Sequence, residues 1–239
     1  MTGDEMPFHV FIKTTGPKSH RCTGSILTQK YILTAAHCAE HMTANGNTTA
    51  YVGIEDTEIT TARTVQMSPV SKITIHPHYD RSRRSSDLAI LRVNLFLKTA
   101  GFGHAHANSA DPRVSETKLA RVAMNHLPTD VCNNRLAPLG YPKVSPRQIC
   151  TRVPALGIKM GYHGGPIVFM HANVSTLYSN RFFKVDSDYG YSQVAIVSYN
   201  VKSETSRNIN VGPRICHYCA FLEEATFHTY QCTVWKKRR

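Results

Sequence analysis

The sequence predicts an all-β protein made of many short strands rather than long helices. Short apolar runs, such as residues 31–33 and 88–91, recur along the 239-residue chain, and Gly, Pro, Asn and Asp often stand between them. Runs of this length bounded by turn-forming residues are typical of antiparallel sheets. The chain is long enough for one sizeable domain or for two small units that share an interface.

The chain is strongly basic. It carries 28 Lys and Arg against 16 Asp and Glu, a formal net charge of +12, and its densest cluster is the C-terminal run KKRR at residues 236–239. Such a surface attracts polyanions, for example a glycosaminoglycan, although it also serves solubility alone. No run of 18 apolar residues is present, so we expect no membrane span.

The sequence has some features of a secreted protein and lacks others. The N-terminal stretch MTGDEMPFHVF has neither a basic region nor an apolar one, so it predicts no signal peptide. The sequons Asn47-Thr48-Thr49 and Asn173-Val174-Ser175 predict a glycoprotein if the chain is secreted. Seven cysteines are an odd number, so at least one is free or pairs outside the chain.

Three stretches carry a family resemblance. Residues 8–35 read as strands joined by turns, with Phe8, Val10 and Ile12 alternating. CTGSILTQKYILTAAHC at residues 22–38, HPHYDRSRRSSDLAILRV at residues 76–93 and GYHGGPIV at residues 161–168 then follow in order. Together they closely resemble the trypsin and chymotrypsin family of serine peptidases.

The resemblance implies a fold and a site. The fold would be two antiparallel β-barrels of the six-stranded type with a cleft between them and a C-terminal helix. His37 would be the catalytic histidine and Asp87 the aspartate of the triad. His163 stands where the family has its serine nucleophile, and Gly161 stands at the oxyanion-hole position. Cys22 would pair with Cys38.

The second half extends the resemblance. LARVAMNHLPTDVC at residues 119–132 and AIVSYN at residues 195–200 match family strands, and Cys150 resembles the partner of Cys132. We expect one domain over residues 1–239. Its first barrel covers about residues 8–105, its second about 115–214, and its helix 215–232. Residues 100–119 are shorter than the family pattern, so the second barrel is incomplete or altered, and residues 169–193 suggest an inserted surface loop.

The site departs from the family at its centre. A serine hydrolase needs an attacking hydroxyl, and His163 does not supply one. Tyr162 replaces the aspartate that receives the new N-terminal ammonium in activated family members, and the chain begins Met1-Thr2-Gly3-Asp4 instead of the usual activated sequence. Gly157, at the base of the specificity pocket, offers no carboxylate. The sequence therefore predicts a serine protease homologue without peptidase activity.

Two groups of residues also suggest metal binding. His37, His163 and Asp87 can together hold a transition metal; alternatively, Asp87 only holds His37 and His163 fills the cleft. Cys216, Cys219, His228 and Cys232 have zinc-like spacing, but on one continuous helix the outer two would lie far apart. Buried thiols or an additional disulfide are then the better interpretation. We predict no cofactor and no resident metal.

The functional prediction is a secreted, monomeric pseudoenzyme that acts by binding. Its partner would be a protein (a peptidase, an inhibitor or a receptor) or a polyanion. The alternative is an enzyme of the serine endopeptidase family that retains some hydrolysis through His37.

Overall fold

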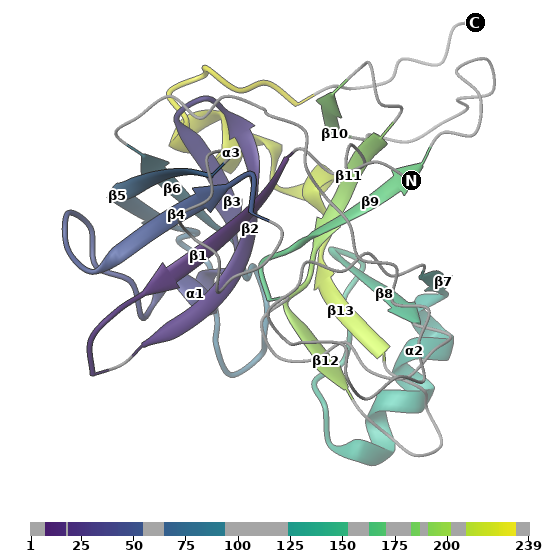
Figure 1. Ribbon diagram of the computed structural model, residues 1–239. Coiled ribbons are helices and arrows are strands. Elements are labelled where there is room, and N and C mark those ends of the chain that lie inside the picture. Colours follow the sequence, from purple (N-terminus) through teal and green to yellow (C-terminus); the bar gives the residue numbers. More distant parts are fainter. Residues whose placement is uncertain are drawn as a thin grey trace, which may run out of the picture.

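The structure is a computed structural model that describes residues 8–17, 19–54, 65–93, 124–152, 163–170, 183–186, 191–201 and 209–232. Strands dominate it, as predicted (Figure 1). The strands are β1 His9–Thr14, β2 His20–Thr28, β3 Tyr31–Thr34, β4 Thr48–Val52, β5 Gln66–Ile75, β6 Ala89–Val93, β7 Asn125–Leu127, β8 Gln148–Arg152, β9 Pro166–Met170, β10 Phe183–Asp186, β11 Tyr191–Ile196, β12 Tyr199–Val201 and β13 Ile209–Pro213. The helices are α1 Ala36–Ala39, α2 Thr129–Leu136 and α3 Cys219–Ala225, with short 3₁₀ turns at Ala137–Leu139 and Ile215–His217.

The first half of the chain forms a closed barrel with the strand order β1-β2-β3-β6-β5-β4. Every neighbouring pair in it is antiparallel. Branched and aliphatic side chains such as Val10, Ile12, Ile32, Leu33 and Leu91 fill its interior with essentially no exposure. Closure leaves no free strand edge, and the barrel expected from the family resemblance is confirmed.

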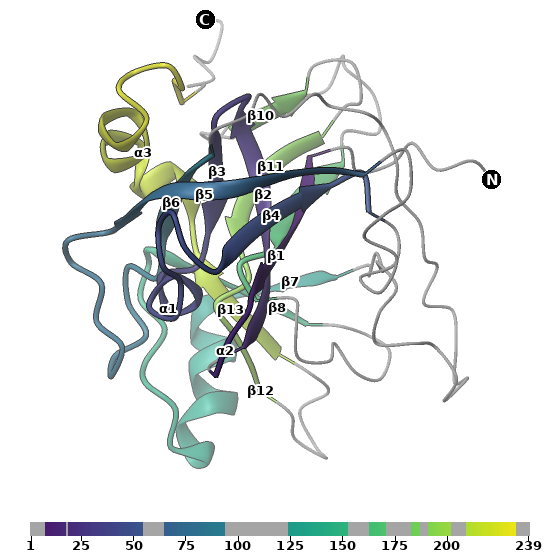
Figure 2. The ribbon, with the colours of Figure 1, turned by 60° about the vertical axis from the view of Figure 1, so that its left-hand side comes forward.

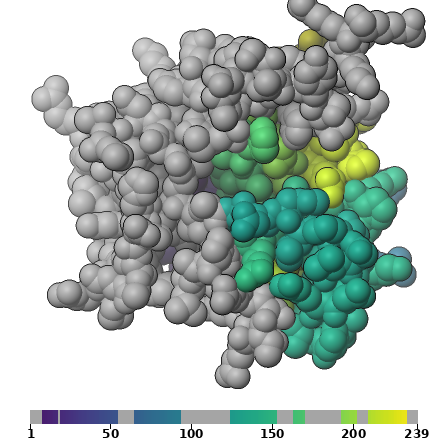
Figure 3. All heavy atoms as spheres, turned by 90° about the vertical axis from the view of Figure 1, so that its right-hand side faces the viewer, coloured from purple at the N-terminus to yellow at the C-terminus, as the bar shows by residue number. Residues whose placement is uncertain are grey.

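The second half forms two sheets in the described part of the chain, one ordered β12-β13-β8-β7 and the other β10-β11-β9. The sheets meet where Ala195 bridges to Arg214. Gly212 allows this approach, because a Cβ there would lie only 1.7 Å from the carbonyl oxygen of Ile196. In Figure 3, residues 124–152 (teal) lie at the surface of this half, next to the green and yellow segments that follow them in sequence.

The segment expected to be an inserted surface loop differs from that expectation where it is described. β9 runs on to Met170, and β10 pairs with β11 within the same region. Ser192 and Gln193 are buried in β11 despite their polarity. The prediction of a surface loop from the polar composition of residues 169–193 is therefore wrong for the segments that form β9, β10 and β11.

The C-terminal helix packs against the first barrel, although it follows the strands of the second half in sequence (Figure 2). Tyr218 and Leu222 belong to the core of that barrel. The helix expected over residues 215–232 ends at Ala225. Beyond it, Phe227 and His228 take φ values of 52° and 57°, which reverses the chain.

This reversal determines how the terminal cysteines pair. The backbone N–H of Cys232 donates to Glu223 Oε1 at 3.0 Å, and Cys232 forms a disulfide with Cys219. Zinc coordination by these two sulfur atoms is therefore ruled out in the oxidised chain, and the additional-disulfide interpretation is confirmed. Within the part of the chain that the structure describes, no helix has both the length and the apolarity needed to cross a membrane.

Candidate active-site cleft

His37 and Asp87 are brought together by the pairing of two barrel strands. His37 lies in α1 directly after β3, and Asp87 lies two residues before β6. Because β3 and β6 are hydrogen-bonded neighbours, their ends place the two side chains side by side. The Nδ1 atom of His37 lies 2.8 Å from Asp87 Oδ2, and the backbone N–H of His37 donates to Oδ1 at 2.9 Å.

Asp87 is buried and fully engaged. Burial alone raises the pKa of its carboxyl, but hydrogen bonds from His37 and Ser198 outweigh burial and hold the pKa below its usual value. The Ser198 hydroxyl donates to Oδ2, the same oxygen that faces the His37 ring. An ionised carboxylate only accepts hydrogen bonds, so the proton of the His37 ring stays on Nδ1 and the Nε2 lone pair points away from Asp87.

His163 lies in a tight turn just before β9. The backbone N–H and the hydroxyl of Thr23 both donate to the His163 carbonyl, at 2.9 and 3.1 Å. The N–H of Gly164 donates to Val197 O at 2.7 Å. Gly164 has φ +82°, and a Cβ there would lie 2.3 Å from Thr23 O, so only glycine fits. The main chain of the turn is thus locked to the first barrel on one side and to β11 on the other.

The two imidazoles meet at their nitrogen atoms. His37 Nε2 lies 3.2 Å from His163 Nδ1, with the ring centroids 5.0 Å apart and an edge-on arrangement. Burial, reinforced by the nearby His37 ring, lowers the pKa of His163 to about 4. His163 is therefore neutral near pH 7, and its Nδ1–H can donate to His37 Nε2.

A pocket of about 220 Å³ opens onto these groups. Tyr79, Arg81 and Arg84 line it beside the residues already described. Arg81 pairs with Glu40 at 3.4 Å, while the Arg84 guanidinium lies 4.8 Å from the centre of the Tyr199 ring. Sequence reasoning missed Tyr79, Arg84 and Ser198. All three lie within stretches that carry the resemblance, Tyr79 and Arg84 in HPHYDRSRRSSDLAILRV and Ser198 in AIVSYN, but no pattern in these stretches indicated that their side chains line the pocket.

The structure brings together three of the predicted site residues, His37, Asp87 and His163. Gly161, predicted for the oxyanion hole, lies outside the described residues, as do Tyr162 and Gly157.

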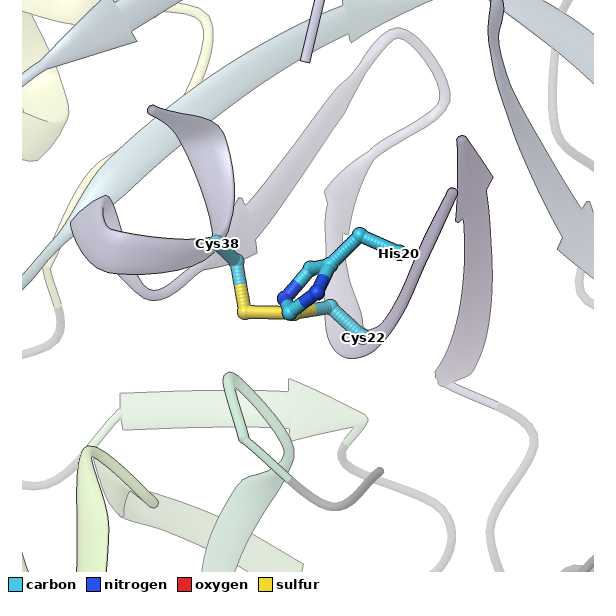
Figure 4. Close-up of side chains that lie close together, drawn as sticks. All are labelled: His20, Cys22 and Cys38. Atoms are coloured by element: carbon cyan, nitrogen blue, oxygen red, sulfur yellow. A yellow bond between two sulfur atoms is a disulfide. The ribbon is translucent and has the colours of Figure 1, made fainter. Parts of the chain in front are cut away.

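Both disulfides implied by the resemblance are present, Cys22–Cys38 and Cys132–Cys150, and Cys216 is a free thiol. The first lies beside the imidazole of His20 (Figure 4). The three side chains come close enough to suggest a metal site. Because the two sulfur atoms are bonded to each other, however, only His20 has a ligand atom to offer.

Comparison with known proteins gives one consistent result. The trypsin family model matches residues 2–96. The chain is 25% identical over 230 residues to the venom peptide isomerase heavy chain of Agelenopsis aperta, a match that covers 84% of this chain and 93% of that protein. It is 26% identical over 189 residues to trypsin Blo t 3 of Blomia tropicalis, covering 68% of this chain and 67% of that protein. Trypsin 5G1 of Aedes aegypti is 34% identical over 90 residues, which cover 38% of this chain and 31% of that protein.

Proposed function

The chain belongs to the trypsin/chymotrypsin-like family of serine peptidases, and from that premise we propose that it lacks peptidase activity and acts by binding. The observation that carries the proposal is the contact between His163 Nδ1 and His37 Nε2 at 3.2 Å. In a working triad this nitrogen accepts the proton of an attacking hydroxyl. Here it faces an imidazole instead.

His163 is a poor replacement for a serine. Its ring is larger than a hydroxymethyl group and occupies space beside His37, with the centroids 5.0 Å apart. Acyl-imidazoles are labile, and none of the described residues of the site is arranged to use one. Loss of the nucleophile alone removes most of the catalysis that a triad provides.

Two further substitutions in the sequence support the proposal. Tyr162 cannot form the buried ion pair that a carboxylate makes with an N-terminal ammonium in active family members. Gly157 leaves the specificity pocket without a carboxylate for a basic side chain. Both changes concern residues outside the structurally described part of the chain and rest on the alignment of the GYHGGPIV stretch.

The charge of the pocket indicates what the protein would bind. Arg81 and Arg84 line the pocket, and the whole chain has a formal charge of +12, so an acidic protein surface or a polyanion is the favoured partner. The three disulfides support a secreted protein, because such bonds persist in oxidising compartments.

The test is a peptidase assay on the purified, disulfide-intact chain. We expect no cleavage of peptide substrates and no labelling by a serine-directed covalent inhibitor, with trypsin as positive control. His163→Ser combined with Tyr162→Asp should recover little activity. Labelling of the wild-type chain, together with turnover that disappears in His37→Ala, would overturn the proposal.

A second candidate function is residual hydrolysis. The favouring observation is the intact hydrogen-bond chain from Ser198 through Asp87 to His37, which keeps a base oriented toward the pocket. It predicts hydrolysis of an activated ester that falls in His37→Ala and in His163→Ala. An unchanged rate in His163→Ala excludes this candidate, and the same assay with a chelator tests for a contribution from a metal.

A further inference from the structure

The facing imidazole nitrogens have a spacing that suits a shared metal ion. Zinc binds imidazole nitrogen at about 2.0–2.1 Å, so two nitrogens on one tetrahedral ion lie about 3.3 Å apart. His37 Nε2 and His163 Nδ1 lie 3.2 Å apart. With the same bond lengths the two ring centroids would be about 5.2 Å apart, and they are 5.0 Å apart.

The hydrogen bonds around His37 prepare it as a ligand. Asp87 holds the proton on Nδ1, which leaves the Nε2 lone pair free to face His163. Histidines that bind metals usually donate their other ring N–H to a carboxylate, which fixes the tautomer and raises the basicity of the ligand. Asp87 in turn accepts from Ser198 and from the backbone N–H of His37, so this supporting layer is complete.

His163 can serve as the second ligand after a change of tautomer. In the metal-free protein its Nδ1–H donates to His37 Nε2, and a metal ion takes the place of that proton when the ring carries its hydrogen on Nε2. The turn that carries His163 is held by main-chain bonds to Thr23 and Val197, so its Cα does not have to move. Preorganised ligands lose little freedom on binding.

The pocket provides access and room for further ligands. Both histidines line its wall, and its volume of about 220 Å³ admits an ion with water molecules. The pocket also carries Arg81 and Arg84, whose positive charge opposes a cation; Glu40 offsets the first. The same arginines favour an anionic group, such as a carboxylate, as the third ligand of a bound ion.

We propose that His37 and His163 form a two-imidazole binding site for a late first-row transition metal ion, with Asp87 as the carboxylate that positions His37. Nitrogen donors favour Zn²⁺ and Cu²⁺ over Mg²⁺ and Ca²⁺. The site goes beyond the binding-only function proposed above and does not depend on it, because it requires neither peptidase activity nor its absence.

Titration calorimetry of the intact chain with Zn²⁺ tests the site. The wild type is expected to bind one equivalent, and both His37→Gln and His163→Gln should weaken that binding at least tenfold. Two control variants remove other neighbouring histidines: His78→Gln breaks the pair of His76 and His78, and His41→Gln breaks the pair of His20 and His41. Both controls should bind Zn²⁺ like the wild type.

A second measurement does not depend on the folding of any variant. In the wild type, nitrogen-15 spectra of the histidine side chains should change on Zn²⁺ addition at His37 Nε2 and His163 Nδ1. Failure of the folded wild type to take up Zn²⁺ overturns the proposal. Unchanged affinity in a folded His163→Gln variant, or shifts confined to other histidines, does so too.

Discussion

Gly164 has a left-handed backbone, φ +82°, in the turn between His163 and β9. The atoms around it leave no room for a side chain, since a Cβ would lie 2.3 Å from both Thr23 O and Thr34 Oγ1. Gly140 also has a positive φ, +71°, but nothing lies within 4 Å of a Cβ built there. A substitution at Gly140 therefore meets backbone strain alone, whereas one at Gly164 meets both backbone strain and a steric clash.

Gly164→Ala should therefore be far more damaging than Gly140→Ala. For Gly140→Ala we expect a loss of about 1 kcal/mol in the free energy of unfolding, from the left-handed backbone alone. For Gly164→Ala we expect a loss of at least about 3 kcal/mol, because strain and overpacking combine. Urea denaturation of both variants measures the difference, and equal losses would contradict the steric argument.

His9 in β1 makes folding stability depend on pH. Its Nδ1 is buried without a hydrogen-bond partner among the described residues, and burial lowers its pKa from 6.5 to about 4. Between these values the unfolded chain takes up a proton that the folded chain does not. Stability that is present above pH 6.5 is therefore lost as the pH falls toward 4.

His9→Gln should reduce this loss. Relative to the variant, the wild type should lose up to about 3 kcal/mol more between pH 6.5 and 4, since one pKa unit corresponds to about 1.4 kcal/mol. Denaturation curves at several pH values measure it. The exposed His78→Gln serves as control and should follow the wild type; identical curves for all three proteins would exclude His9 as the source.

At the residue scale, the site residues were predicted from motifs that resemble a family and not from the chemistry of single side chains. His37, Asp87 and His163 were predicted because each stands at a triad position of a recognisable stretch, and the structure brings them into contact. Arg84 and Tyr79 were not predicted, since their position in the pocket depends on how a loop before β6 folds back. The nitrogen-to-nitrogen distance that suggests a metal site has no counterpart in sequence spacing.

Among the elements, the C-terminal segment depends on one covalent bond. α3 has only seven residues, which is short for a stable helix, and the Cys219–Cys232 disulfide ties its start to the chain beyond its end. Thr226 closes the helix by donating to Leu222 O at 2.8 Å. The disulfide and the burial of Leu222 in the core of the barrel thus both stabilise the position of this helix.

Replacing Cys219 and Cys232 together by serine should lower the free energy of unfolding by about 3 kcal/mol, the loop-closure value for a bridge across 13 residues. Thermal unfolding measures the change. Cys216→Ser removes a free thiol and should change stability by less than about 1 kcal/mol. If the single variant proves as damaging as the double one, the terminal cysteines pair differently from the structure.

Strands of the first barrel were predicted from the sequence better than the C-terminal helix and the region around β11. Strands β1 to β3 and β6 were predicted because their apolar runs are short and bounded by turns, whereas no apolar run predicted β4. The helix over residues 215–232 was expected to be longer because the sequence between Cys216 and Cys232 contains no Gly or Pro. Phe227 and His228 end it instead, with left-handed backbones that propensity does not predict. Residues 169–193 were expected to be a loop for a related reason. Ser192 and Gln193 are polar but buried in β11, because pairing with neighbouring strands overrides the preference that composition indicates.

At the scale of the whole molecule, charge is the dominant property. If polyanion binding accompanies the proposed function, it should depend on where the positive charges lie as well as on their number. The run at residues 236–239 is the densest cluster in the sequence.

Replacing residues 236–239 by glutamine should lower the salt concentration at which the protein elutes from heparin, because fewer counterions are released on binding. A charge-matched control replaces four scattered basic residues, Arg21, Lys72, Arg83 and Arg92, which lie exposed on the first barrel. Equal shifts for the two variants would assign binding to net charge and exclude the tail as a distinct site.

The core of the first barrel includes side chains from the C-terminal part of the chain. Ile196 of β11, and Tyr218, Leu222 and Tyr230 near the C-terminus, pack with its strands, which are complete by Val93. During synthesis more than a hundred residues must follow before these side chains exist, which takes roughly 5–30 s at ordinary elongation rates. Until then the apolar interior of the barrel is incomplete, so its strands must pass through a long partly folded interval during synthesis.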